Sequence, residues 1–75
     1  MNYNDVRKVR KELGMTLSEL ARRSRASRET ITNIELHNQV PNGLLMLRIA
    51  DALKVDAKDI FFEYSANHEL QRRVK

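Results

Sequence analysis

The side chains best suited to specific recognition lie within six positions of this 75-residue sequence, Arg28 to Asn33. Positions three and four apart are neighbours on a helix, so a helical segment would carry four polar residues on one face: Arg28, Glu29, Thr32 and Asn33. Arginine can hydrogen-bond to guanine, asparagine to adenine and glutamate to the cytosine amino group, while threonine can contact the thymine methyl. These residue types can therefore distinguish bases. The alternatives are that Arg28 is a solvated charge and that Glu29 only stabilises a helix N-terminus.

Positive charge is concentrated in the first half of the chain. The net charge is +4, but residues 7–28 contain eight bases and two acids, whereas residues 29–69 contain three bases and seven acids. A basic segment of this density in a small domain favours a polyanionic partner such as nucleic acid. The alternative is a solvated basic face that binds nothing.

Several classes of chemistry are excluded by what the sequence lacks. The absence of cysteine removes disulfides, thiolate zinc sites and cysteine nucleophiles, and it favours a reducing compartment, so we expect a cytoplasmic protein. Two glycines, Gly14 and Gly43, cannot form a glycine-rich phosphate-binding loop. His37 and His68 lie far apart in the sequence, which favours surface histidines over a metal site. We therefore expect no catalytic residue, no metal and no cofactor.

The chain length allows one hydrophobic core and leaves little room for an enzymatic cleft. At roughly 0.05 to 0.15 kcal/mol per residue, a chain of 75 residues has about 4 to 11 kcal/mol of stability. The longest uninterrupted apolar run, Leu44 to Leu47, is far shorter than the ~20 residues of a membrane span, and the polar N-terminus lacks a signal-peptide core. We expect neither membrane association nor catalysis.

Apolar residues recur at helical spacing along the chain, and no alternating strand pattern competes with them. The sequence predicts an all-α domain of five short helices, of which the first covers about residues 5–13 and the third about residues 28–36. Each helix is preceded by a residue that can cap its N-terminus: Asn4, Thr16, Ser27, Asn42 and Asp56. The inward positions predicted for the first four helices and for the turn after the second are Val6, Val9, Leu13, Leu17, Leu20, Ala21, Ser24, Ala26, Ile31, Ile34, Met46, Ile49, Ala50 and Leu53, and the short fifth helix carries Ile60 and Phe61.

Two features mark the boundary between the first and second helices. Gly14 stands where a left-handed C-terminal cap is needed, a conformation that glycine adopts without steric cost. Thr16 and Glu19 have the spacing of a capping box, in which Thr16 accepts from the Glu19 backbone N–H and the Glu19 side chain reaches back to the N-cap N–H.

A short turn, Ser24 to Ser27, separates the second and third helices. The apolar residues of the two helices lock them together, and the small side chain of Ala21 permits a close crossing. The polar face that begins at Arg28 therefore stays free for a partner.

Motifs between residues 6 and 61 occur in the order and spacing of one known family. They are Leu13–Thr16, Glu19–Ala21, Ser27–Ile31, Ile34–Glu35, Pro41, Ile49–Leu53 and Asp59–Phe61. On these motifs the sequence resembles the lambdoid phage repressor and Cro-like (XRE) helix-turn-helix family. The resemblance implies a five-helix repressor-like domain that binds double-stranded DNA.

The resemblance also implies roles for individual residues. The third helix would lie in the major groove, with Arg28, Glu29 and Asn33 at base edges and Thr32 beside them. The family's orienting arginine–glutamate pair falls on Arg10 and Glu35. Contacts to DNA phosphates fall on the start of the second helix, the turn and the loop after the third helix: Thr16, Leu17, Arg25, Ser27, Asn38 and Gln39.

Three residues depart from the family pattern, and one of them is Gly43, which stands where a leucine usually opens the fourth helix. Leu17 stands where many members have a phosphate-binding glutamine, so backbone N–H groups would replace that side chain. Arg25 stands at a turn position usually occupied by glycine, so either Arg25 adopts a positive φ or the turn is distorted.

The remaining expectations concern assembly. One recognition helix contacts about four base pairs, which favours a homodimeric repressor on a palindromic operator; we expect no small-molecule effector. Residues 1–62 would form the DNA-binding domain, and residues 63–75 an extension that serves dimerisation or is a final turn, an edge segment or a tail. The interface candidates are Leu44, Phe61, Phe62 and Tyr64. The alternative function is a small protein–protein adaptor or antitoxin-type module on the same fold.

Overall fold

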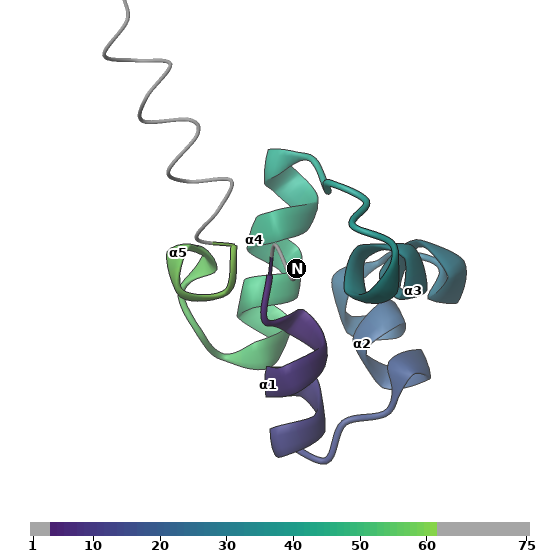
Figure 1. The fold of residues 1–75 in the computed structure, drawn as a ribbon. Coiled ribbons are helices and arrows are strands. Elements are labelled where there is room, and N and C mark those ends of the chain that lie inside the picture. The colour runs from purple at the N-terminus through teal and green to yellow at the C-terminus, as the bar shows by residue number, and fades with distance from the viewer. Residues whose placement is uncertain (1–3, 62–75) are drawn as a thin grey trace, which may run out of the picture.

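The computed structural model describes residues 4–61, which fold into five helices (Figure 1). They are α1 (Val6–Glu12), α2 (Leu17–Ser24), α3 (Arg28–Leu36), α4 (Gly43–Leu53) and α5 (Ala57–Ile60). Residues 4–61 contain no strand, and the predicted all-α class is confirmed. Within the same range, no helix has the length and apolar character needed to cross a membrane. The expected extension 63–75 lies outside the described residues, as do Phe62 and Tyr64.

Side-chain caps start three of the helices as predicted. The Thr16, Ser27 and Asn42 side chains each accept a hydrogen bond from the backbone N–H three residues further on, at 3.1, 3.0 and 2.8 Å. Each such cap stabilises its helix by about 1 kcal/mol. Asp56 occupies the N-cap position of α5 as predicted, but its side chain makes no cap hydrogen bond there.

The first helix, α1, is one residue shorter at each end than predicted. Its N-cap position is Asp5, and the Asn4 side chain accepts from the Val6 N–H at 3.0 Å without being the cap residue itself. Leu13 follows the helix and is 53% exposed, so its predicted inward position is wrong. The chain turns here because Gly14 takes a φ of +67°, as predicted.

Three helices, α1, α2 and α4, end in the same C-terminal motif. A residue just beyond the end of each helix has a left-handed φ: Gly14 at +67°, Arg25 at +59° and Lys54 at +61°. The N–H of that residue and the N–H of the next donate to carbonyls of the last turn at 3.0 to 3.3 Å, which is the Schellman pattern. Arg25 thus resolves the open alternative, since it adopts the positive φ and the turn keeps its regular hydrogen bonds.

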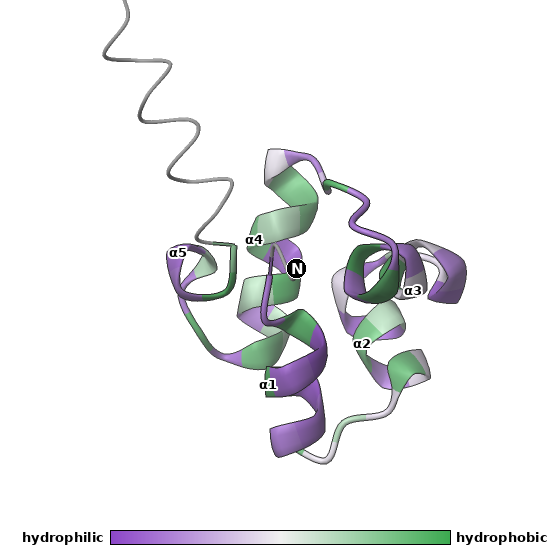
Figure 2. Ribbon diagram, in the orientation of Figure 1, coloured by the Kyte–Doolittle hydropathy of each residue, from purple (hydrophilic) through white to green (hydrophobic). Residues whose placement is uncertain are grey.

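The hydrophobic core joins all five helices, and Figure 2 shows apolar residues along much of α4 at the centre of the molecule. Most predicted inward positions are buried, whereas Val9, Leu17, Ala26 and Met46 are half-buried and pack against the edge of the core, as does Met15. The buried apolar residues are Val6, Leu20, Ala21, Ile31, Ile34, Ile49, Ala50, Ala52, Leu53, Ile60 and Phe61.

Phe61 belongs to this core, and its assignment to a dimer interface is wrong. Its side chain is 1% exposed and is the largest of the fully buried ones. Its backbone N–H donates to the Ala57 carbonyl at 2.8 Å, which closes the single turn of α5. A domain of this size has few large apolar residues to fill its centre, so the last aromatic of the described chain is used inside.

Large apolar side chains are exposed around the start of α4. Leu36 ends α3, Val40 lies in the following loop, and Leu44 and Leu47 lie in the first two turns of α4. These four residues are 55 to 63% exposed. Leu44, the remaining interface candidate within residues 4–61, is therefore on the surface as predicted.

Candidate nucleic-acid interface

The turn between α2 and α3 is built by backbone and hydroxyl hydrogen bonds. The Ala26 N–H donates to the Ala21 carbonyl at 3.0 Å, and the fully buried Ser24 hydroxyl donates to the Leu20 carbonyl at 2.7 Å. Ser27 then caps α3, and its hydroxyl also donates to the Thr30 hydroxyl at 2.9 Å. This turn fixes where α3 begins relative to α2.

The outer face of α3 carries the four residues predicted to contact bases. Arg28 and Glu29 are exposed in the first turn, and Thr32 and Asn33 are half-buried one turn later. The opposite face is anchored in the core by Ile31 and Ile34, both 0% exposed. The structure therefore brings the four side chains to one side of the helix, as the sequence predicts.

Arg28 also reaches the beginning of α2. Its Nη1 donates to the Ser18 hydroxyl at 3.4 Å, so the Arg28 side chain extends from the first turn of α3 to the first turn of α2. Ser18 could not be identified from the sequence, because a contact between residues ten positions apart depends on the angle between two helices. The contact brings two helix N-termini, each with free N–H groups and a positive dipole end, to one region of the surface.

The residues predicted to bind phosphates lie around this region but differ in what they offer. Thr16 uses its hydroxyl to cap α2, and the Leu17 side chain packs against the core, so the first-turn N–H groups are what this end presents. Arg25 is exposed in the turn, held there by its left-handed backbone. Ser27 is exposed too, with its hydroxyl engaged in the cap of α3.

The loop after α3 is tied back to that helix. The Asn33 carbonyl accepts from the backbone N–H groups of His37 at 2.9 Å and Gln39 at 3.1 Å. Asn38, between them, takes a φ of +58°. Asn38 and Gln39 are both exposed, so the predicted phosphate-binding loop is on the surface and anchored to the helix that carries the base-contacting face.

Arg10 and Glu35 form the ion pair that the family resemblance implies. Arg10 Nε donates to Glu35 Oε2 at 2.7 Å and Nη2 donates to Oε1 at 3.1 Å, while Nη1 donates to the Met15 carbonyl at 2.8 Å. The side chains are 11% and 3% exposed. The hydrogen bond that Arg10 donates to Glu35 raises the pKa of Arg10 further above its ordinary value, although burial opposes this. The pair joins α1 to the last turn of α3.

Part of the positive charge of α2 is neutralised within the helix. Glu19 accepts from Arg22, whose Nη2 lies 2.7 Å away, and from Arg23. These hydrogen bonds lower the pKa of the Glu19 carboxyl. The predicted capping box is thus only half formed, because the Glu19 side chain turns towards the arginines.

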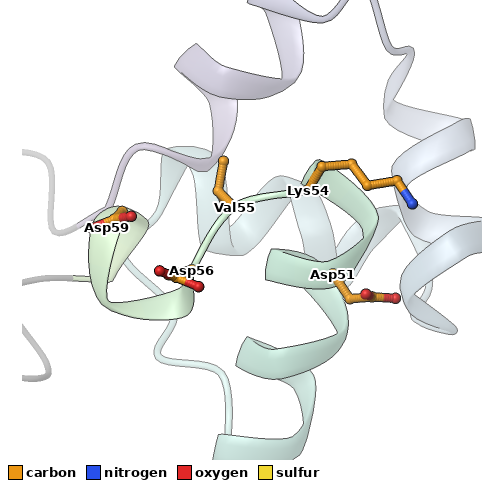
Figure 3. A pocket seen from close by; sticks show the side chains of 5 residues that line it. All are labelled: Asp51, Lys54, Val55, Asp56 and Asp59. Atoms are coloured by element: carbon orange, nitrogen blue, oxygen red, sulfur yellow. The ribbon is translucent and has the colours of Figure 1, made fainter.

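An acidic pocket lies where α4 meets α5, and Figure 3 shows its lining from close by. Its walls carry three carboxylates and one ammonium group, from Asp51, Asp56, Asp59 and Lys54. Residues 4–61 contain no group of three or more side chains placed to hold a metal ion. Figure 1 shows α4 between α5 and the α2–α3 pair, so the acidic pocket is well separated from α3. Carboxylates repel DNA phosphates, which makes the α2–α3 side the better surface for nucleic acid.

Comparison with known proteins agrees with this geometry. The family model described as helix-turn-helix matches residues 6–60, the range that contains all five helices. An uncharacterized HTH-type transcriptional regulator of Methanothermobacter thermautotrophicus is 44% identical over 57 residues, which are 75% of this chain and 83% of that protein.

Proposed function

Since the chain belongs to the XRE-type helix-turn-helix family and is a DNA-binding transcription regulator, we propose that it is a dimeric repressor of a palindromic operator. In this proposal α3 lies in the major groove, and Arg28, Glu29, Thr32 and Asn33 contact base edges. The observation that carries the proposal is the single polar face of α3, whose opposite side is fixed in the core by Ile31 and Ile34. The groups proposed to hold phosphates are the α2 N-terminus at Thr16 and Leu17, together with Arg25, Ser27, Asn38 and Gln39.

The first test separates base contacts from general attraction to DNA. Selection of bound duplexes from random DNA supplies the operator, and each variant is titrated against operator, single-pair variants and random duplex. We expect Arg28→Ala and Asn33→Ala each to cost about 1 to 3 kcal/mol on operator and little on random DNA, because base contacts discriminate and phosphate contacts do not. The two variants should relax preference at different base pairs, since the two residues lie more than one turn apart on α3.

Lys58→Ala is the control for this test, because it also removes one exposed positive charge but from α5. Its operator-to-random ratio should match that of the parent protein. An unchanged ratio for both Arg28→Ala and Asn33→Ala would mean that α3 does not contact the bases.

We propose that the exposed apolar residues at the start of α4 form the dimer interface. Leu44 and Leu47 are three residues apart and lie on one side of the helix, 57% and 63% exposed. In a two-fold dimer, each protomer would bury its Leu44 and Leu47 against those of its partner. Phe61 is excluded from the interface by its place in the core.

A homodimer is expected in sedimentation equilibrium at tens of micromolar protein. Leu44→Asp should shift the protein to monomer, because it would bury an unpaired carboxylate at the interface. Leu13→Asp is the matched control, since Leu13 is 53% exposed beyond the end of α1 and is not part of this interface. A parent protein that remains monomeric even with operator present would contradict the proposal.

A further inference from the structure

Asn4 makes two hydrogen bonds that connect parts of the molecule far apart in sequence. Its Oδ1 accepts from the Val6 N–H at 3.0 Å, and its Nδ2 donates to the Ile34 carbonyl at 3.1 Å, across 30 residues. The residue is 7% exposed and is one of two buried polar residues within residues 4–61. A polar side chain is seldom buried without such partners, so this environment is specific for an amide that can both accept and donate.

The Ile34 carbonyl lies in the last turn of α3, where carbonyl groups lack partners from their own helix. The preceding carbonyl, that of Asn33, accepts from the loop N–H groups of His37 and Gln39. The Ile34 carbonyl accepts instead from Asn4, outside the helix and its loop. One end of α3 is therefore completed by a side chain from the segment before α1.

The same segment is fixed on its other side. The Asp5 N–H donates to the Ile60 carbonyl at 3.0 Å, which ties the chain next to Asn4 to the end of α5. At the far end of α1, Arg10 holds Glu35, the residue that follows Ile34. Two consecutive residues of α3 are thus held from the two ends of α1. One contact fixes a point of the helix, and a second contact also limits its rotation about that point.

From this geometry we infer that Asn4 is a positioning residue for DNA recognition, which acts through the Ile34 carbonyl to set the angle at which α3 meets the bases. The inference rests on the proposed function of α3. Asn33, a proposed base contact, is adjacent to Ile34 and belongs to the same helical turn. A change in the angle of this turn alters base contacts, which need good alignment, more than it alters phosphate contacts.

The test compares two substitutions that keep the hydrogen bond to α1 and remove the one to α3. Asn4→Asp retains an oxygen for the Val6 N–H but replaces the donor with a carboxylate oxygen facing the Ile34 carbonyl. Asn4→Ser retains a hydroxyl for the same N–H but is too short to reach Ile34. Both are titrated against the selected operator and random duplex, at a temperature where circular dichroism shows every variant folded.

We expect either variant to lower operator affinity by about tenfold, the effect of misaligning one bidentate base contact. Affinity for random DNA should stay within about twofold of that of the parent protein, because phosphate contacts are preserved. The slope of log affinity against log salt should stay unchanged for the same reason. Ile49→Val, a core substitution in α4, is the control for lost stability and should leave the operator-to-random ratio unchanged.

Asn33→Ala, measured in the same series, separates failure of this inference from failure of the proposed function. If Asn33→Ala lowers the operator-to-random ratio while neither Asn4 variant does, Asn4 has only a structural role. If these three variants and Arg28→Ala all leave the ratio unchanged, α3 does not contact bases and the proposed function fails as well. Should Asn4→Asp prove unfolded, Asn4→Ser alone decides between these outcomes.

Discussion

Operator affinity is expected to fall by about four orders of magnitude when monovalent salt rises from 50 to 200 mM. If each subunit displaces the counterions of about four phosphates, a dimer displaces about eight, and the slope of log affinity against log salt is roughly −7. The N-termini of α2 and α3, which the 3.4 Å contact between Arg28 and Ser18 brings together, supply the positive field, and exposed Arg25 adds a full charge beside them.

Titration by fluorescence anisotropy over this salt range measures the slope directly. Arg25→Gln should make the slope shallower by about 2 in a dimer, because one phosphate contact is lost from each subunit. Lys58→Ala, which removes a charge from the far side of α4, should leave the slope unchanged. A parent slope shallower than about −2 would contradict an electrostatic DNA interface and favour the adaptor function on this fold.

The second large effect is expected on folding stability. Arg10→Ala should lower the free energy of unfolding by about 3 to 5 kcal/mol, because it leaves the Glu35 carboxylate buried without its partner and removes the donor to the Met15 carbonyl. The whole domain has about 4 to 11 kcal/mol of stability, so this loss removes a large part of it and lowers the temperature at which the folded fraction falls. Affinity for operator and for random DNA should fall together, since the folded fraction limits both.

Urea unfolding followed by circular dichroism measures this loss. The double variant Arg10→Met/Glu35→Leu provides the control. It removes the Glu35 carboxylate together with its arginine partner, so no unpaired charge is buried and much of the stability should be recovered. A loss below about 1 kcal/mol for Arg10→Ala would place the pair among exposed ion pairs, in conflict with its burial.

The sequence was sufficient to predict features set by short-range rules. The caps at Thr16, Ser27 and Asn42 follow from residue type and from the apolar residues that come next, and all three form. The polar face of α3 follows from helical spacing alone. The Arg10–Glu35 pair, 25 residues apart, was predicted only through the family resemblance.

Features that depend on competition between partners were not predictable. Glu19 has both a backbone N–H and two arginines within reach, and its carboxylate binds the arginines, with which donor and acceptor are both charged. The use of Phe61 depends on how much of the core the other helices fill, which no local pattern shows. The bond from Asn4 to Ile34 requires the relative position of two helices, so the sequence indicated Asn4 only as a helix cap.

Of the three left-handed residues that are not glycine, Arg25 and Lys54 follow the ends of helices in the Schellman pattern, and these two positions differ in how freely they can change. A side chain at positive φ costs about 1 kcal/mol relative to glycine, so both Arg25 and Lys54 hold the fold below the stability it could reach. At position 54, beside the acidic pocket, a change from lysine to glycine could recover that energy without altering the α2–α3 surface. At position 25, a change from arginine to glycine would remove a positive charge next to α3. Thermal tolerance can therefore evolve at the end of α4 independently of DNA affinity, whereas the two are coupled at the end of α2.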